Sequence, residues 1–336
     1  MKELFIKNYR NHALKRLKFT RKSNIITGNN GIGKTNILES VYMLSTTASH
    51  KTGNNTELIK EKEKGFNLKA LIADKIGEKE IEIKYERFKG MKTLINGTNV
   101  SKTEYLQNFP AVFFSPEDIE ILRGSSSELR RLINISLSQL NPLYAKILIR
   151  YSKINKERNA VLRSIKKRET KSLKIWTELL KKESIKISNS RKKFIEYINK
   201  YLQKLSSKMN INEKYKLCYK PNLYSDNYIR RDLEKKYTTW GAHRDIFYFS
   251  INENNMKYFG SRGELRMAAF LFKMSLWKLI KSKTGKNPII ILDDVFSELD
   301  MGKRNKIISN MEKTQILMST TYIPEKIDIS ANIINL

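Results

Sequence analysis

The sequence contains one cysteine, Cys218, among its 336 residues. A single cysteine excludes an intramolecular disulfide and a zinc site built from paired cysteines. The sequence also shows no N-terminal hydrophobic segment, and none of its apolar runs approaches the roughly 20 residues that span a bilayer. We therefore expect a cytosolic protein, and its length is sufficient for a hydrophobic core plus a second lobe.

Acidic residues are scarce relative to basic ones. Asp and Glu together number 34, against 65 Lys and Arg, so the formal net charge is +31. Such an excess favours a polyanionic partner, with nucleic acid as the main candidate. The chain is rich in Lys, Asn and Ile throughout, however, so part of the charge reflects overall composition.

Residues 28–35 match the phosphate-binding loop pattern G-x-x-x-x-G-K-[ST] at every position. A β-branched run at 23–27 precedes the loop, and apolar residues at helical spacing follow it at 36–44. This is the strand, loop and helix order that the pattern requires. We therefore expect a nucleotide-binding loop, rather than a chance glycine-rich turn, made of Gly28, Asn29, Asn30, Gly31, Ile32, Gly33, Lys34 and Thr35.

The residue types in this loop suit phosphate chemistry. Glycines let backbone N–H groups wrap closely around phosphates, and the N-terminus of the following helix adds a favourable dipole. We expect Lys34 to reach the β- and γ-phosphates and the Thr35 hydroxyl to hold Mg²⁺.

A second candidate segment is an aliphatic run at 288–292 that ends in Asp293 and Asp294. An uninterrupted apolar run suits a central parallel strand that is covered on both faces. A carboxylate buried at its tip is costly unless a metal or a positioned water compensates. We predict that Asp293 is the metal carboxylate, directly or through water, and that Asp294 orients or deprotonates the attacking water. An Asp-Asp pair after a strand is also compatible with a simple turn or a helix cap.

A third segment, Gly-Ser-Arg-Gly-Glu-Leu-Arg at 260–266, precedes an apolar-periodic helix at 267–280. Ser261 can cap that helix, and Gly263 leaves an amide open, so the helix start also suits an anion. The pattern is weak by itself, but its position shortly before the acidic strand increases its value.

Basic residues concentrate between 141 and 220, where 23 Lys/Arg face 6 Asp/Glu. The segment predicts two helices, each with one apolar stripe, joined by a break around 168–172 and folded back as a hairpin. The first helix is expected to be roughly 35 Å long. Interruptions of the stripes fall at Arg158, Glu183 and Arg191.

The lysines that face away from the stripes have two interpretations. They form either a solvated face in a lysine-rich protein or a row of phosphate contacts along DNA, which position a duplex without reading its sequence. Aromatic residues on the stripe, Trp176 and Tyr201, favour packing over base stacking. The basic set comprises Lys166, Lys167, Arg168, Lys181, Lys182, Lys192 and Lys193.

The predicted fold class is α/β, with residues 1–115 and 236–336 forming one lobe and residues 116–235 a helical insert. Alternating apolar and charged residues at 68–94 predict antiparallel strands. The last predicted strand covers 315–321, and its terminal Thr320 and Thr321 suit either a γ-phosphate contact or ordinary strand packing.

These segments together resemble the ABC-type ATPases of the SMC/Rad50 group, and within that group the RecF family of bacterial recombination-mediator proteins. The similarity runs nearly end to end. The segments 115–118 (Ser-Pro-Glu-Asp) and 241–245 (Gly-Ala-His-Arg-Asp) narrow the resemblance to that family. The helix start at 261–264 differs, because it reads Ser-Arg-Gly-Glu where the signature of the family usually reads Ser-Gln-Gly-Gln. Other matching segments are 8–11, 113–114, 130–131, 143–144, 157–159 and 292–300.

The resemblance implies an ABC-type P-loop ATPase lobe with antiparallel edge strands and a short helical arm. It implies ATP and Mg²⁺ as cofactors, with Arg10 and Asn36 among the nucleotide contacts. Ser261 and Gly263 would act in trans, capping the γ-phosphate held by Lys34 and Thr35 of a second copy. ATP would then drive homodimerisation, with weak DNA-stimulated hydrolysis.

The same resemblance implies partners and a role. The partners are DNA, as single strands, duplex or gap junctions, and a RecR-like mediator protein; the role is in recombinational repair and replication. Two alternatives stay open: a non-catalytic nucleotide-dependent DNA-binding module, and the ATPase subunit of a nuclease complex.

Overall fold

The structure, a computed structural model, describes residues 1–73, 77–165, 170–294, 314–321 and 331–336. The chain forms two compact units, Met1–Asp118 with Leu276–Leu336, and Ile119–Ser275. The sequence analysis instead placed the second boundary at 235/236. Residues 236–275 group with the arm because their strand β10 pairs along its length with β9, which follows the arm helices.

The first unit contains a six-stranded antiparallel sheet, as the alternation at 68–94 predicts. Its inward positions are apolar, for example Leu4 and Ile6 on β1 and Leu68 on β4. In spatial order its strands are β2 (His12–Lys18), β1 (Glu3–Tyr9), β4 (Gly65–Ala73), β5 (Glu78–Glu86), β6 (Gly90–Ile95) and β7 (Thr98–Val100).

A second, five-stranded sheet of this unit is entirely parallel. The two predicted buried strands, at 23–27 and 288–294, correspond to β3 and β12, and all residues of β12 are buried. Their neighbour β13 lies between them. The spatial order is β14 (Asn332–Asn335), β3 (Ser23–Thr27), β13 (Ile316–Ser319), β12 (Ile289–Asp293) and β8 (Ala111–Phe114).

Helix α1 (Lys34–Thr46) contacts strands of both sheets, including β1 and β4 of the first and β12 and β13 of the second. Every residue from Ile37 to Thr46 is buried, as expected for a helix enclosed on all sides. The loop between β3 and α1 is therefore fixed at both ends by core packing. Shorter elements of this unit are η1 (Asn55–Leu58) and α2 (Lys102–Tyr105), and α3 (Asp118–Arg123) begins at its boundary with the second unit.

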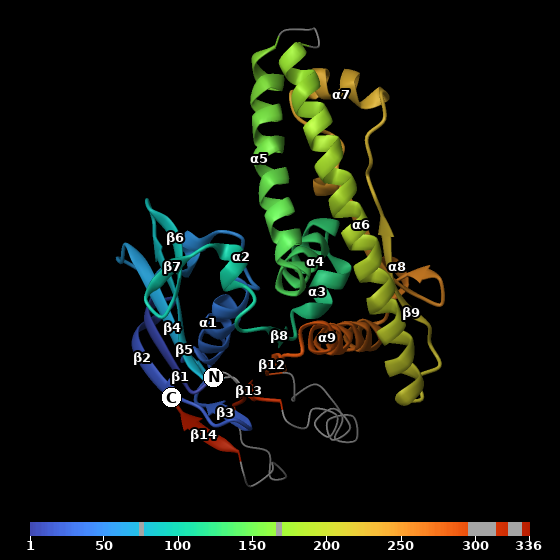
Figure 1. The fold of residues 1–336 in the computed structure, drawn as a ribbon. Coiled ribbons are helices and arrows are strands. Elements are labelled where there is room, and N and C mark those ends of the chain that lie inside the picture. The colour runs from blue at the N-terminus through green and yellow to red at the C-terminus, as the bar shows by residue number, and fades with distance from the viewer. Residues whose placement is uncertain (74–76, 166–169, 295–313, 322–330) are drawn as a thin grey trace. The chain divides into compact units, whose positions relative to one another are not determined.

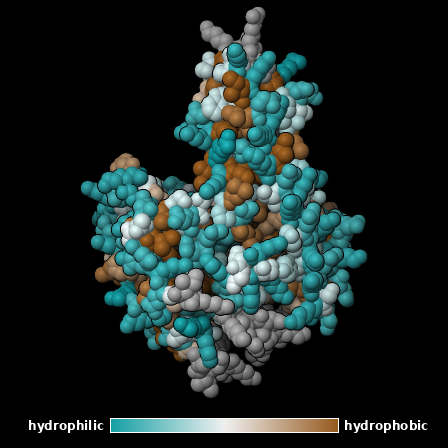
Figure 2. Space-filling model, in the orientation of Figure 1, coloured by the Kyte–Doolittle hydropathy of each residue, from teal (hydrophilic) through white to brown (hydrophobic). Residues whose placement is uncertain are grey.

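The second unit is built around the predicted helical hairpin, α5 (Pro142–Ser164) and α6 (Lys171–Lys208), which pack along each other (Figure 1). Asn141 caps α5 by accepting from the N–H groups of Leu143 and Tyr144. Hydrophilic atoms dominate the arm surface in Figure 2, with apolar patches between them. The other elements are α4 (Ser126–Leu140), β9 (Tyr215–Lys220), α7 (Asn227–Lys235), η2 (Ala242–Arg244), β10 (Ile246–Ile251), β11 (Asn254–Asn255), α8 (Met256–Phe259) and α9 (Arg262–Thr284).

Candidate functional site

The phosphate-loop residues lie between β3 and α1, with Gly33 at the N-cap of the helix. Gly33 has φ of 104°, and a Cβ there would lie 2.6 Å from side-chain atoms of Asn11 and His12. Both constraints require glycine at this position. Asn29, Asn30, Gly31 and Ile32 are exposed, so the outer part of the loop is accessible to a ligand.

Lys34 folds back over its own loop. Its Nζ donates to the carbonyl oxygens of Gly28, at 2.7 Å, and Asn29, at 3.0 Å. An ammonium has three donors, so one remains for a further acceptor. The lysine is therefore held at the loop by its own backbone.

Thr35, Asp293 and Ser319 form a hydrogen-bonded cluster at the carboxyl ends of the parallel strands. Thr35 Oγ1 and Ser319 Oγ both donate to Asp293 Oδ1, at 2.9 and 2.6 Å. Asp293 is only 6% exposed. Hydroxyl and carboxylate oxygens are the ligands that Mg²⁺ prefers, so Thr35 and Asp293 fit the metal role predicted for them. Ser319 was not identified from the sequence, because a serine at a strand end carries no specific signal.

Asp294 differs from its neighbour in being exposed, with φ of 49°. This left-handed conformation is uncommon for a residue other than glycine. Its backbone N–H donates to Ser319 Oγ at 3.1 Å, which ties the turn to the Asp293 cluster. The left-handed conformation at Asp294 leaves its side chain at the surface, while Asp293 stays buried.

The two threonines after β13 have different surroundings. Thr320 is buried, and its N–H donates to the carbonyl of Ile26, as in ordinary strand pairing. Thr321 is exposed. Neither observation assigns a phosphate contact to them, and that interpretation stays a prediction.

Arg10 makes a bidentate ion pair with Glu39 of α1, at 2.8 and 2.9 Å. Burial works to raise the pKa of Glu39, but hydrogen bonds from Arg10 and Ser49 outweigh it and hold the pKa below its ordinary value. Arg10 also donates to the carbonyl of Glu57 at 3.0 Å. This pair anchors β1 to α1, so a nucleotide contact by Arg10 remains a prediction.

Asn36 is the other expected nucleotide contact beside the loop. It is hydrogen-bonded to Asn11, which follows Arg10 in the turn between β1 and β2. Its Nδ2 donates to Asn11 Oδ1 at 2.8 Å, and Asn11 Nδ2 in turn donates to the carbonyl of Ile32 at 3.1 Å. Asn11 thus connects the loop to the start of α1.

Ser261 and Gly263 begin α9 in the second unit, and both are exposed. The Ser261 N–H donates to Glu264 Oε2 at 2.7 Å, and the Glu264 N–H donates to Ser261 Oγ at 3.2 Å. This reciprocal pattern is a capping box, which glutamate and glutamine both satisfy. A Cβ on Gly263 would meet nothing within 4 Å, so the space beside this glycine is open. The helix start is therefore accessible and ordered.

The sequence profile of the family described as "RecF/RecN/SMC N terminal domain" matches residues 1–323. The chain is 33% identical to "DNA replication and repair protein RecF" of Lachnospira eligens, over 98% of this chain and 94% of that protein. It is 34% identical to the protein of the same name from Acetivibrio thermocellus, over 95% and 92%. The chain belongs to the RecF family. The predicted resemblance is thereby confirmed, and this RecF-family chain is assigned to a family of ATPases.

Solved structures agree with this assignment. A structure described as "recombination mediator protein RecF-ATP in RecFOR pathway" superposes on this RecF-family chain with a TM-score of 0.89 at 30% identity, covering 97% of this chain and 93% of that one. An SMC head bound to the C-terminal winged-helix domain of ScpA gives a TM-score of 0.52 at 14% identity, over 96% and 89%, and shows the shared fold alone. The predicted α/β fold of the ABC ATPase type is confirmed.

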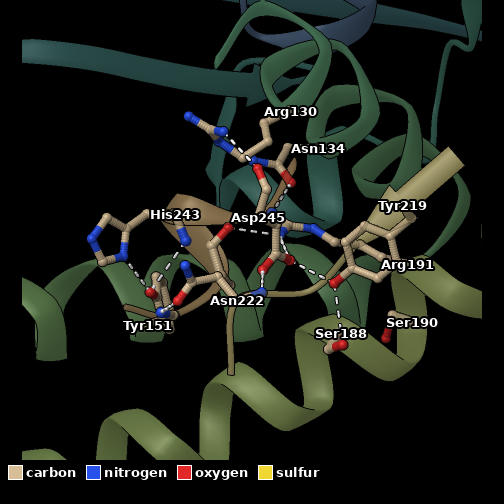
Figure 3. Close-up of polar contacts among 12 residues, drawn as sticks. Arg130, Asn134, Tyr151, Ser188, Ser190, Arg191, Tyr219, Asn222, His243 and Asp245 are labelled. Carbon is tan, nitrogen blue, oxygen red and sulfur yellow. Dashed lines mark hydrogen bonds and ion pairs between the residues drawn. The ribbon is translucent and has the colours of Figure 1, made fainter. Parts of the chain in front are cut away.

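Several motifs that carried the family resemblance meet in a buried polar cluster of the second unit (Figure 3). Arg191 of α6 donates to Asp245 Oδ2 at 2.5 Å and to Asn134 Oδ1 at 2.9 Å. Asp245 also accepts from Tyr219 OH at 2.5 Å and from the N–H of Asn222 at 2.8 Å. Asp245 therefore joins the arm to the three-stranded sheet. The sequence analysis treated Arg191 as a gap in an apolar stripe, whereas its side chain is 1% exposed.

His243, in the same motif, is held as a neutral ring. Its Nε2 lies 3.3 Å from the carbonyl of Thr238, which can only accept, so Nδ1 accepts from Tyr151 OH at 2.5 Å. Burial, with Arg244 and Arg130 nearby, lowers the pKa of His243 to about 4 from 6.5, although Thr238 and Asp245 oppose the shift.

This lowered pKa predicts a pH dependence of stability. Between pH 6.5 and 4 this histidine is protonated in the unfolded chain but neutral in the folded chain. The free energy of unfolding therefore falls as the pH falls. We expect a loss on the order of 2 kcal/mol, reduced from the full shift because the ring is partly exposed. Urea unfolding should show a flatter pH profile for His243→Asn than for the wild type. Parallel profiles would contradict the assignment.

The basic set of the arm is only partly described. Lys182, Lys192 and Lys193 are exposed on α6, as predicted. Lys181 is engaged, with its Nζ 2.7 Å from Glu178 Oε1 and 3.7 Å from the Tyr224 ring centroid. Residues 166–168 lie outside the described residues, as do residues 295–300 of the acidic-strand motif. In the part of the chain that the structure describes, no helix has the length and apolar character needed to cross a membrane.

Proposed function

We propose that this protein is an ATP-dependent DNA-binding protein of recombinational repair and replication. In this proposal it dimerises on ATP, hydrolyses ATP slowly with stimulation by DNA, and acts in the cytoplasm. The observation that carries the nucleotide part is the hydrogen bond between Thr35 and Asp293, which joins the phosphate loop to the acidic strand across 258 positions of sequence. The family relationship supports the DNA part, together with the formal net charge of +31.

The chemistry follows from the residues around that contact. In this proposal, backbone N–H groups of the loop and the start of α1 bind phosphate oxygens, and Lys34 adds a positive charge beside them. Thr35 and Asp293 would hold Mg²⁺, which supplies charge neutralisation on the phosphates when bound. Asp294, exposed at the rim, is the candidate to orient the attacking water. Ser319 fixes both aspartates by bonding the carboxylate of one and the N–H of the other.

The dimer part depends on the start of α9. An exposed, capped helix N-terminus with open space beside its glycine suits the γ-phosphate of a nucleotide held by a second copy. ATP then favours the closed dimer because only that state makes the contacts in trans. A RecR-like mediator protein is the proposed protein partner, in keeping with the recombination-mediator pathway named for a solved relative.

Ser261→Arg is expected to abolish ATP-dependent dimerisation while leaving ATP binding intact. The larger side chain fills the space beside Gly263, which in the proposal faces the nucleotide of the second copy. ATP binding is unaffected because each subunit binds ATP at its own phosphate loop. Light scattering with a slowly hydrolysed ATP analogue measures the dimer, and nucleotide titration measures binding.

Two variants control for this change. Glu264→Gln keeps the capping box and should dimerise like the wild type. Ser127→Arg adds the same charge at another exposed serine of the second unit and should also dimerise. A full dimer population with Ser261→Arg would refute the role in trans.

Phosphate release, measured with and without gapped duplex DNA, tests the enzymatic part. We expect slow release that rises when DNA is added. The absence of release under every condition, with DNA binding retained, would favour the non-catalytic binding module instead.

A further inference from the structure

The hairpin between β5 and β6 carries the most exposed large apolar side chain of the described residues. Phe88 is 95% exposed. It is the middle residue of a three-residue loop, 87–89, which is closed by pairing of Glu86 with Gly90. Gly90 has φ of 80°, the left-handed residue that such loops use to rejoin the ladder. Phe88 therefore stands at the apex of a regular hairpin.

The apex is held in place from both sides. The Lys89 N–H donates to the carbonyl of Glu86 at 3.2 Å, and the Arg87 N–H donates to the carbonyl of Lys64, beside the start of β4, at 3.0 Å. An ion pair of 2.7 Å joins Lys89 to Glu86. Exposing a phenyl ring to water on a fixed turn is unfavourable, and burial within the molecule does not offset that free energy.

Basic residues, Arg87 and Lys89, precede and follow Phe88 in the sequence. A row of residues also crosses the outer face of the sheet just behind the hairpin. In that row Lys7 pairs with Asn67, Asn67 with Lys84, and Lys84 with Lys92. All three lysines are exposed.

The lysine row is unfavourable for the isolated fold. Lys84 and Lys92 lie directly opposite each other on neighbouring strands, and like charges in that position destabilise a sheet. Glu82, 3.3 Å from Lys84 Nζ, and Glu86, which interacts electrostatically with Lys92, offset this repulsion in part. Neighbouring strands are about 4.8 Å apart, so the row presents its charges across roughly 15 Å of surface. A polyanion bound along the row relieves this repulsion.

We infer that Phe88 and the lysine row form a DNA contact in which the row binds backbone phosphates and the ring stacks on an unpaired base. The inference rests on the DNA-binding function proposed above and deepens it, because it assigns recognition of a strand discontinuity to one hairpin. A continuous duplex contains no unpaired base for the ring, whereas a gap or a single-strand junction does. Aromatic side chains between cations are the usual means of holding exposed bases.

A protein partner is the less favoured occupant of this surface. A partner that buried Phe88 in an apolar pocket would also have to desolvate Arg87 and Lys89 beside it, and charged groups are depleted from the centres of protein interfaces. Phosphates next to a base stack accept both cations at no such cost.

The test measures binding of the full chain with ATP to three labelled DNAs: a gapped duplex, a continuous duplex of equal length and a single strand. Phe88→Ala should lose roughly 10-fold in affinity for the gapped duplex and the single strand, with little change on continuous duplex. Phe88→Trp should retain the affinity, and Phe88→Leu, which is apolar but cannot stack equally, should lose it. Lys84→Ala with Lys92→Ala should weaken binding to all three DNAs and reduce the salt slope by about 1–2.

A 2-aminopurine base at the edge of the gap gives a direct readout, since its fluorescence should change with the wild type and Phe88→Trp only. Thermal melting controls for folding, and the exposed position of Phe88 predicts an unchanged midpoint in all its variants. Equal affinities of wild type and Phe88→Ala for gapped DNA would overturn the inference, as would an equal loss on all three DNAs. Absence of binding by the wild type to any DNA would instead overturn the proposed function, and the hairpin contact with it.

Discussion

Replacing Lys34 by alanine should reduce ATP hydrolysis by at least about 100-fold, the usual effect of removing a charged group that stabilises a transition state. The substitution removes the cation placed beside the phosphates. It also removes the hydrogen bonds that Lys34 makes to the carbonyls of Gly28 and Asn29, so the loop loses its internal brace. ATP binding should weaken as well, because in the proposed site the lysine contacts phosphates in the ground state and in the transition state. Phosphate release with saturating DNA and nucleotide titration measure the two effects separately.

Two further variants make this result interpretable. Lys34→Arg keeps the charge but carries a planar group that cannot make the same compact contact, so it should recover binding more than hydrolysis. Lys18→Ala removes an exposed lysine of β2 from the same unit and should leave hydrolysis unchanged. Hydrolysis by Lys34→Ala at the wild-type rate would show that the phosphate loop is not the catalytic site.

The elements of the proposed nucleotide site could be predicted from sequence because their signals are local. The loop at 28–35 fixes a strand before it and a helix after it, and the structure has β3 and α1 there. The apolar run before Asp293 likewise specifies a buried parallel strand. That the loop and Asp293 lie close together follows from one rule, because the carboxyl ends of parallel strands share one edge of a sheet. Ser319 escaped prediction because its importance arises only from its position between β3 and β12.

The arm was correctly predicted as two helices, but the two arginines that anchor them through buried ion pairs were interpreted as interruptions of the apolar stripes. Arg158 and Arg191 interrupt apolar stripes, and local periodicity treats such residues as gaps. In the structure both are buried, paired with Asp232 and Asp245 from segments far along the chain. Burial of an arginine depends on a distant carboxylate, which no local pattern can supply. The same limit explains why the compact units divide at a different second boundary, since pairing of β10 with β9 is a contact between separate segments.

Asp232→Ala should destabilise the second unit by about 3–5 kcal/mol, the usual cost of leaving a buried charge without its partner. Arg158 and Asp232 are both 0% exposed and lie 2.7 Å apart. Asp232 also accepts from Trp240 Nε1 at 3.0 Å and from both the N–H and the hydroxyl of Thr239, at 2.8 and 2.7 Å. One substitution therefore removes the acceptor of four donors. Urea unfolding followed by circular dichroism and tryptophan fluorescence measures the loss.

Comparison with other variants separates the buried charge from helix effects. Glu234 lies on the same helix, α7, and pairs with Arg230 at 3.2 Å with both side chains exposed, so Glu234→Ala should barely move the unfolding midpoint. Replacing both buried partners, with Arg158→Met and Asp232→Leu, should recover much of the stability lost by Asp232→Ala, because no unpaired charge remains. Recovery can only be partial, since Thr239 and Trp240 still lose their acceptor, and Thr177 and Thr238 lose the hydrogen bond donated by Arg158. A double variant as unstable as the single one would assign the loss to those hydrogen bonds, and not to the buried guanidinium.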